Sequence, residues 1–309
     1  MNLLALICFL LSLSTLNSRV ANEINIEFVK QNENLSGNAP SPPPLSNRTL
    51  SSIVNGLDSP RRQFFVRIKY RLSFCGGSVI NERFVLTAAH CVASLLPRQL
   101  TVEVGDHSVP DSFLTNYFAD AVFIAPGFEF SDTPVNDLAL VRTRSPIAHG
   151  NQIALPICPD LIRPDDMPST FLGFCGMGAT SSRSYSFPPT LQETFFKQIP
   201  FETYGLFQFN FCRHDLVCTS PLLGDDAHIA VMDEGGPLYI LDCEEFLEPP
   251  RCLYGVATYS RNRNQEHNEE GYGPGSYFVR VGLFLSWIDH VMQHNPGGGS
   301  GRRGPMGDD

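Results

Sequence analysis

The sequence predicts an all-β protein made of antiparallel strands, with one helix near its C-terminal end. Short runs rich in β-branched and aromatic residues recur between residues 53 and 295, and turn-forming residues separate them. Many short strands with a turn about every 8 to 12 residues are typical of a sandwich or a barrel. Near the end of this region, Phe284, Trp287, Ile288 and Val291 fall on one face at helical spacing. We expect Trp287 to anchor that helix to the body.

The expected strands form two series along the chain. The first series covers residues 64–68, 77–80, 84–87, 100–104, 119–124 and 138–141. The second series covers residues 171–174, 192–199, 238–241, 253–258 and 277–281. Together they delimit the folded domain, which we expect to span residues 53–295.

Length and charge narrow the class of protein. The chain has 309 residues, of which 42% are hydrophobic and 17% charged, values that are ordinary for a globular protein with a sizeable core. Its formal net charge is -10, and no basic run is long enough to follow a phosphate backbone. Nucleic acid is therefore not an expected partner.

Both ends of the chain differ from the expected domain. Residues 1–18 resemble a secretory signal, because a nearly continuous apolar stretch is followed by small and polar residues. No apolar run in the sequence reaches the roughly 18 residues that a membrane span needs. Residues 19–52 form a proline-rich leader with glycosylation sequons at Asn34 and Asn47. Residues 296–309 are a glycine-rich tail that composition predicts to be disordered. We expect a secreted, extracellular glycoprotein.

Three sequence boxes point to a known catalytic arrangement. They surround His90 (residues 86–91), Asp137 (residues 136–140) and Glu234 (residues 233–238). In this order they resemble the His, Asp and Ser boxes of the chymotrypsin-like (trypsin-type) serine peptidases. Further likenesses to that family lie at residues 53–56, 75–78, 176–181 and 255–260. The resemblance implies two six-stranded antiparallel β-barrels with the active site at their junction.

The resemblance assigns a role to each member of the triad and shows which one is changed. His90 would be the general base, and Asp137 would hold its tautomer and stabilise its cation. For His90 the alternative is a satisfied buried histidine. Glu234 stands where the nucleophilic serine belongs, and a carboxylate is a poor nucleophile toward an amide. We expect the Glu234 carboxylate to contact the imidazole and so to raise the pKa of His90.

The oxyanion site and the specificity pocket also depart from the family pattern. The oxyanion donors would be the backbone N–H groups of Met232 and Glu234. Met232 stands where the family has glycine, and we expect its side chain to disfavour the backbone geometry that points the N–H inward. The pocket positions are His228, Thr258, Tyr259 and Ser260, with His228 on the floor and Tyr259 and Ser260 on the wall. A cysteine of the family pocket is replaced by Ala230.

Activation by cleavage is altered as well. In the family, cleavage before Ile53 would free an ammonium that pairs with Asp233. The preceding residue is Ser52, which gives a trypsin-like activator nothing to recognise, and Arg48 is the nearest alternative. We expect the protein to persist uncleaved or to be cut by an enzyme of other specificity.

The nine cysteines include Cys8 in the signal, which leaves an even number for an oxidising compartment. The resemblance implies the bridge Cys75–Cys91, which closes a loop worth about 3 kcal/mol. The other six cysteines allow several pairings, of which we expect Cys212–Cys218, Cys243–Cys252 and Cys158–Cys175.

These features together predict a catalytically inactive serine protease homologue that acts by binding. Its expected partner is a protein: an active peptidase, an inhibitor or another extracellular protein. We expect no cofactor, and the acidic clusters lack convincing spacing for a metal site. The alternatives are a serine-type endopeptidase with unusual or residual activity, and a structural extracellular component.

Overall fold

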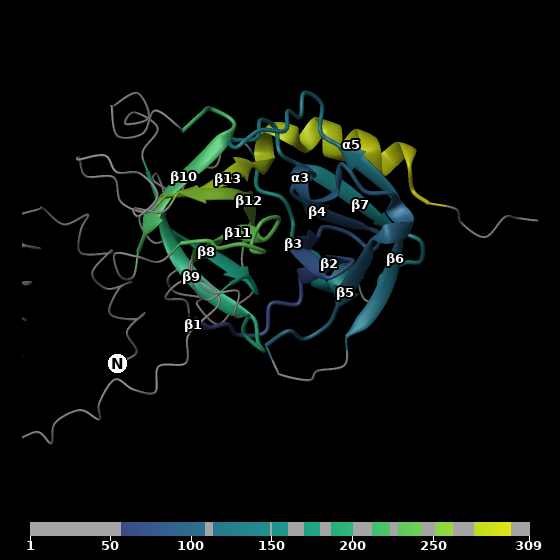
Figure 1. Ribbon diagram of the computed structural model, residues 1–309, viewed down its shortest axis with the longest axis horizontal. Coiled ribbons are helices and arrows are strands. Elements are labelled where there is room, and N and C mark those ends of the chain that lie inside the picture. Colours follow the sequence, from purple (N-terminus) through teal and green to yellow (C-terminus); the bar gives the residue numbers. More distant parts are fainter. Residues whose placement is uncertain are drawn as a thin grey trace, which may run out of the picture.

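The chain folds into two β-barrels that lie side by side (Figure 1). The structure is a computed structural model that describes residues 57–108, 114–148, 150–159, 170–179, 187–199, 212–222, 228–242, 251–261 and 275–297. It confirms the predicted fold class of two six-stranded antiparallel barrels with a C-terminal helix.

The first barrel closes in the order β2-β3-β4-β7-β6-β5. Its interior is filled by β-branched and aromatic side chains, as on β2, where Phe65, Val66 and Ile68 are buried and Lys69 is exposed. The strand bounds are β2 Phe65–Tyr70, β3 Ser73–Val79, β4 Phe84–Thr87, β5 Thr101–Val104, β6 Thr115–Ile124 and β7 Ala139–Thr143.

The second barrel is built from a sheet in the order β1-β9-β10-β13-β12-β11-β8. An additional β9–β8 pairing closes six of these strands, and β1 extends the sheet beside β9. Phe174, Phe196 and Phe278 are fully buried in it, with ring centroids 5.5 to 6.4 Å apart. The bounds are β1 Leu57–Asp58, β8 Thr170–Gly176, β9 Gln192–Gln198, β10 Leu216–Pro221, β11 Pro237–Asp242, β12 Cys252–Arg261 and β13 Gly275–Arg280.

Every strand expected from the sequence overlaps an observed one, and two observed strands were missed. The short β1 and the six-residue β10 had not been predicted. In β10 only Leu216 and Val217 are large and apolar, and Pro221 ends the strand. Its first four residues are nevertheless buried, because Val217 packs in the core cluster that contains Phe278, and Leu216 and Cys218 pack in a second cluster with Tyr277.

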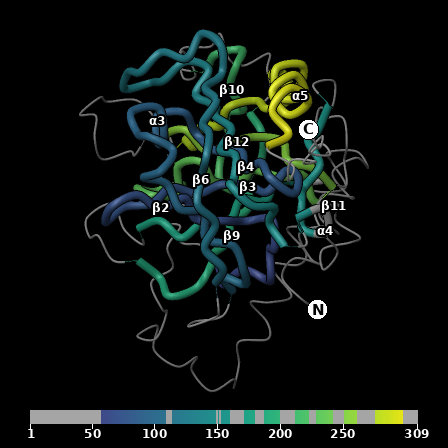
Figure 2. The backbone as a smooth tube through the Cα atoms, turned by 90° about the vertical axis from the view of Figure 1, so that its right-hand side faces the viewer, coloured from purple at the N-terminus to yellow at the C-terminus, as the bar shows by residue number. Residues whose placement is uncertain are grey.

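The C-terminal helix α5 (Leu285–His294) follows the second barrel but crosses to the first, as Figures 1 and 2 show. Ile288 and Val291 are buried, while Phe284 and Trp287 pack edge-to-face at the margin of the core. Asn81 donates a hydrogen bond to Met292 Sδ at 3.1 Å. The helix therefore ties the end of the chain to the first barrel, and the predicted anchoring face is confirmed.

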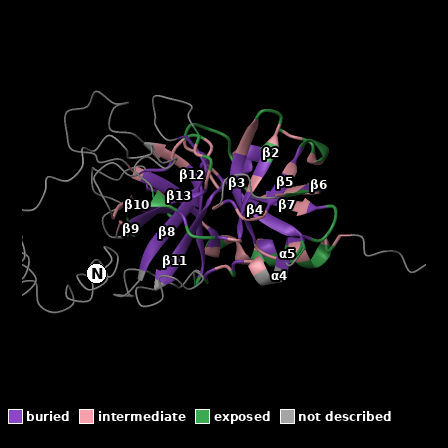
Figure 3. Ribbon diagram, turned by 90° about the horizontal axis from the view of Figure 1, so that it is seen from below, coloured by how far each residue is buried: buried purple, intermediate pink, exposed green. Residues whose placement is uncertain are grey.

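The remaining helices are short: α3 Ala89–Val92, η1 Pro97–Gln99, α4 Gly150–Ile153 and η6 Val281–Phe284. Buried residues run through the strands of both barrels, with exposed residues mainly at turns and on α5 (Figure 3). None of the helices in the described part of the chain combines the length and the apolar character needed to cross a membrane.

The cysteine pairing is partly as expected and partly different. Cys75–Cys91 and Cys212–Cys218 are confirmed. The predictions Cys158–Cys175 and Cys243–Cys252 are wrong, because Cys158 is bonded to Cys252, with the two Cα atoms 5.1 Å apart. The fold brings the segment after the first barrel beside β12, where Cys158 N–H donates to Leu253 O. Cys175 is a buried free thiol on β8, and Cys243 lies outside the described residues.

A buried charged cluster joins the two halves. Arg62, in the segment entering β2, forms an ion pair with Glu193 on β9 at 2.9 Å. Tyr239 on β11 donates a hydrogen bond to the same carboxylate. All three side chains are almost fully buried, so the pairing compensates charges that would otherwise be costly to bury.

Candidate functional site

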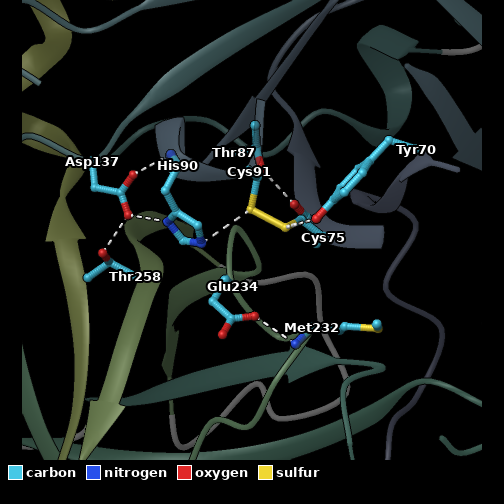
Figure 4. Close-up of a disulfide and its surroundings, with 10 residues drawn as sticks. Tyr70, Cys75, Thr87, His90, Cys91, Asp137, Met232, Glu234 and Thr258 are labelled. Atoms are coloured by element: carbon cyan, nitrogen blue, oxygen red, sulfur yellow. Dashed lines mark hydrogen bonds and ion pairs between the residues drawn. A yellow bond between two sulfur atoms is a disulfide. The ribbon is translucent and has the colours of Figure 1, made fainter. Parts of the chain in front are cut away.

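His90, Asp137 and Thr258 form a hydrogen-bonded chain at the junction of the barrels (Figure 4). His90 lies on α3, Asp137 precedes β7, and Thr258 lies on β12. Asp137 Oδ2 lies 2.7 Å from His90 Nδ1 and accepts a 2.5 Å hydrogen bond from Thr258 Oγ1. Asp137 Oδ1 accepts the His90 backbone N–H at 2.8 Å. The fully buried carboxylate therefore fixes the orientation of the ring.

This environment favours the charged form of the imidazole. Burial lowers the pKa of His90, but the hydrogen bond and charge of Asp137, together with the charge of Glu234, raise it above its ordinary value. Because Nδ1 faces Asp137, Nε2 is the atom available to take a proton. Its neighbour is Cys91 Sγ at 3.6 Å. The geometry is that of a general base and its orienting carboxylate.

Glu234 lies beside this pair, but its carboxylate turns away from the imidazole (Figure 4). Oε2 accepts a 2.6 Å hydrogen bond from the backbone N–H of Met232, and the backbone N–H of Glu234 itself lowers the pKa of the carboxylate. No hydrogen bond joins Glu234 to His90, although both lie within the described part of the chain. The expected direct contact is therefore wrong, and the two groups interact through charge alone.

The state of the Glu234 carboxyl reflects its position. Burial raises the pKa of Glu234 above its usual value, against the opposing effects of the two N–H donors and His90. The charge of Asp137 adds to the increase. A buried anion beside another carboxylate is costly unless hydrogen bonds stabilise it, and the two backbone donors do so.

Met232 retains the backbone shape that its side chain was expected to disfavour. Its φ is +74°, in the left-handed region that glycine adopts most readily. The N–H consequently points at the Glu234 carboxylate. Met232 adopts this conformation at a cost, because the surrounding contacts impose it on a residue that intrinsically disfavours it.

The buried side chain of Asp233 holds this loop in place. Its buried carboxylate accepts the N–H groups of Gly178 at 2.7 Å and Ala230 at 2.9 Å. Burial raises the pKa of Asp233 well above its ordinary range, although these two donors oppose the change. Ile53 lies outside the described residues, so its pairing with Asp233 stays a prediction.

Further backbone contacts fix the loop to both barrels. Gly76 on β3 donates its N–H to Glu234 O at 2.8 Å. Gly235 donates to Ala257 O on β12 at 2.8 Å. Gly235 has φ +81°, and a Cβ there would collide with the Thr87 hydroxyl. Only glycine fits at this position, which explains the Gly235-Gly236 pair after Glu234.

The predicted pocket residues lie along β12 and beside β13. His228 is buried, Ser260 is half-buried, and the half-buried Tyr259 ring stacks on Tyr277 with centroids 4.6 Å apart. Thr258 is a further predicted pocket position, and its hydroxyl bonds to Asp137. Asn34 and Asn47 lie outside the described residues.

Sequence reasoning missed a pair that holds the Asp137 segment. Arg213 and Asp215, which precede β10, are joined at 2.9 Å. Arg213 donates to the carbonyls of Thr133 at 3.2 Å and Pro134 at 2.6 Å, and Asp215 Oδ2 accepts the Asn136 N–H at 3.4 Å. The second barrel thereby braces the loop of the first. No local sequence pattern signals a contact over about 80 residues.

One group of metal-type ligands is close enough to consider. Ligand atoms of Cys75, His90 and Cys91 lie within 4.8 Å of one another. The two sulfurs are bonded to each other, so neither is a thiolate that could bind an ion.

Comparison with known proteins accounts for this arrangement. The sequence matches the trypsin family over residues 53–288, a range that includes every site residue described above. The chain belongs to the trypsin family. Membership agrees with the two barrels, with the His90–Asp137 geometry and with the position of the site at their junction.

Trypsin-family relatives match the chain at modest identity. Chymotrypsin-like elastase family member 1 of Macaca fascicularis is 24% identical, over 72% of the chain and 79% of the relative. Kallikrein-7 of Homo sapiens is 27% identical, over 71% and 78%. Complement C1s subcomponent of Bos taurus is 35% identical over 80% of the chain, which spans only 36% of that protein.

A solved structure of similar architecture supports the fold. The scabies mite inactivated protease paralogue S-D1 aligns with a TM-score of 0.60 at 22% identity, over 78% of this chain and 97% of that one. At this identity the likeness concerns the architecture.

Proposed function

We propose that this chain is a secreted trypsin-family protein that has lost peptidase activity and acts by binding, as a cofactor or regulator of proteolysis or as a decoy. The observation that carries the proposal is the Glu234 carboxylate beside the His90–Asp137 pair, held by the Met232 N–H at 2.6 Å. His90 is oriented by Asp137, but position 234 carries a carboxylate and therefore offers no hydroxyl for His90 to activate.

The chemistry at Glu234 argues against turnover in two ways. Attack by its carboxylate on an amide would have to produce a mixed anhydride, and two N–H donors make the anion still less nucleophilic. Those donors are also the groups that would stabilise the oxyanion of a tetrahedral intermediate. In a related triad, loss of the serine lowers turnover by about 10⁶-fold.

Secretion belongs to the same proposal. The signal-like residues 1–18 lie outside the described part of the chain, while the three disulfides suit an oxidising compartment. The scabies mite relative is an inactivated protease paralogue, which supports inactivity as a known outcome for this fold.

Residual or unusual endopeptidase activity is the second candidate. It is favoured by the 2.7 Å His90–Asp137 contact and by the left-handed backbone of Met232, since both belong to a competent site. Against this candidate, the site has no serine at position 234 to act as the nucleophile.

Exposure of the purified protein to a fluorophosphonate probe and to a mixed peptide library separates these candidates. We expect neither labelling nor cleavage under conditions in which trypsin shows both. Peptide hydrolysis that is lost in Glu234→Ala or His90→Ala would contradict the proposal.

The binding role has its own test. Affinity purification from the fluid that contains the secreted protein should recover a stoichiometric protein partner, identified by mass spectrometry. Tyr259→Ala alters a predicted pocket position next to Thr258, whereas His290→Ala on the exposed face of α5 serves as the matched control. We expect the first variant to weaken recovery and the second to leave it unchanged. Recovery of the chain without any partner would favour a structural role.

A further inference from the structure

We infer that the oxyanion site of this protein is fully formed and is occupied by the carboxylate of Glu234, so that one substitution, Glu234→Ser, is enough to make the site acylable. This goes beyond the proposed binding role, because it concerns what the backbone can still do when the carboxylate is removed.

Two donors converge on one acceptor group at this site. The Met232 N–H donates to Oε2 at 2.6 Å, and the Glu234 N–H acts on the same carboxylate by lowering its pKa. These are the two backbone positions that would receive the oxyanion in a working trypsin-family enzyme. A carboxylate oxygen resembles that oxyanion in charge and size, so Glu234 acts as an internal anion ligand.

The donors do not depend on the Glu234 side chain for their orientation. Asp233 is held by the N–H groups of Gly178 and Ala230, and Gly236 donates to Asp233 O at 3.0 Å. The Glu234 carbonyl is bound by the Gly76 N–H. With these contacts unchanged, removal of the carboxylate leaves both N–H groups pointing into the site.

The base is equally independent of Glu234. Asp137 accepts hydrogen bonds from His90 Nδ1, from His90 N and from Thr258 Oγ1, and none of these involves residue 234. His90 Nε2 is therefore oriented to take a proton from a hydroxyl placed next to it.

Glu234→Ser should consequently react with a fluorophosphonate. The serine oxygen attacks phosphorus, the P–F bond breaks, fluoride leaves, and the hydroxyl proton passes to His90 Nε2. The phosphoryl oxygen takes the position of the former carboxylate between the two N–H groups. This reagent needs no specificity pocket, so the changes at His228 and Ala230 do not obscure the result.

The experiment compares four proteins: wild type, Glu234→Ser, Glu234→Ala and the double variant Glu234→Ser/His90→Ala. We expect labelling of Glu234→Ser alone, and a loss of about 10²-fold or more when the base is removed. A Glu234→Ser protein that melts as cooperatively as wild type but remains unlabelled overturns the inference. Labelling of the double variant at the same rate as Glu234→Ser also overturns it.

A second measurement decides the matter if Glu234→Ser does not fold. In the wild-type protein, the amide resonance of Met232 should shift with protonation of the Glu234 carboxyl, with a midpoint above the ordinary glutamate value. Glu234→Gln should abolish this transition. A Met232 amide that does not respond to the titration shows that the carboxylate is not bound there, and the inference fails.

Discussion

The two barrels contribute to the candidate site in different ways. The first barrel supplies His90 and Asp137, whose side chains are placed as catalysis requires. The second supplies the loop from Ala230 to Gly236, whose backbone retains the competent shape while its side chains do not. Under the proposed function, the site has kept its framework after losing its reactive atom.

The physical reason lies in the contacts that hold each half of the site, the His90–Asp137 pair in the first barrel and the loop from Ala230 to Gly236 in the second. The first half is held through side chains, because the ring orientation of His90 depends on the Asp137 carboxylate. The second half is held through backbone hydrogen bonds and one buried carboxylate, Asp233. Side chains at positions 232 and 234 can therefore change without disturbing the loop.

The largest effect is expected where the halves are joined. Arg62→Met would leave Glu193 buried without its ion-pair partner, and removal of one partner from a buried pair typically costs about 3–5 kcal/mol. Urea unfolding at pH 7 measures the loss. Arg61→Met is the matched control, since its ion pair with Asp106 is exposed and worth at most about 1 kcal/mol. Equal effects of the two variants would show that the buried pair does not join the barrels.

The second prediction concerns the loss of stability at acidic pH that His107 in the first barrel should cause. His107 is buried against Phe65, and burial, together with Arg67, lowers the pKa of His107 to about 4. Glu103 and Asp106 oppose this decrease. The unfolded chain, with an ordinary value near 6.5, binds this proton more readily between pH 4 and 6.5. Stability should therefore be complete above about pH 6.5 and fall by about 3 kcal/mol as the pH decreases to 4.

Chemical unfolding of wild type and His107→Gln across this range checks that sign. The variant is expected to be less stable at pH 7 but to have a shallower decline toward pH 4. His290→Gln on α5 is the control and should follow the wild-type curve. Parallel curves for wild type and His107→Gln would mean that other groups cause the acid sensitivity.

The individual strands could be predicted because short β-rich runs are local signals, whereas the two barrels and the bridge Cys75–Cys91 were implied by the family resemblance. The boxes around His90 and Asp137, which carry that resemblance, also depend on neighbouring residues. What failed depended on distant contacts. The bond between Cys158 and Cys252 joins residues 94 positions apart, which no local spacing reveals.

Distant contacts also explain why the sequence did not reveal the direction of the Glu234 carboxylate or the backbone conformation of Met232. The direction of the Glu234 carboxylate is decided by a competition between the imidazole and two backbone donors, and sequence does not show which donors converge. Met232 was judged by intrinsic preference, but the tertiary contacts of Asp233 and Gly236 impose φ +74° on it. Intrinsic preference is weak where the surroundings fix the backbone.

The third prediction tests that imposed backbone. Met232→Gly should relieve the cost of a left-handed residue and stabilise the protein by about 1 kcal/mol, partly offset by the greater entropy of glycine in the unfolded chain. Thermal and urea unfolding measure the change. Val231→Gly is the matched control: Val231 does not have a positive φ, so its substitution should destabilise by up to about 1 kcal/mol. A loss of stability in Met232→Gly would show that the Met232 side chain contributes more than its backbone costs.

The smallest expected effect is the change in the pKa of His90 in Glu234→Gln. Its comparison with the change in Asp137→Asn separates the two halves of the site most directly. Burial lowers the pKa of His90, whereas the hydrogen bond of Asp137, its charge and the charge of Glu234 raise it, and the net change is upward. His90 therefore contributes stability that is present below its unfolded pKa and lost as the pH rises through the folded value. NMR titration of the imidazole should show a large decrease in pKa for Asp137→Asn and a smaller one for Glu234→Gln. The order follows from contact, since Asp137 bonds to the ring while Glu234 is directed toward Met232. A decrease of equal size in both variants would place the Glu234 carboxylate against the imidazole, and the division of the site into an intact base and a self-occupied oxyanion site would no longer hold.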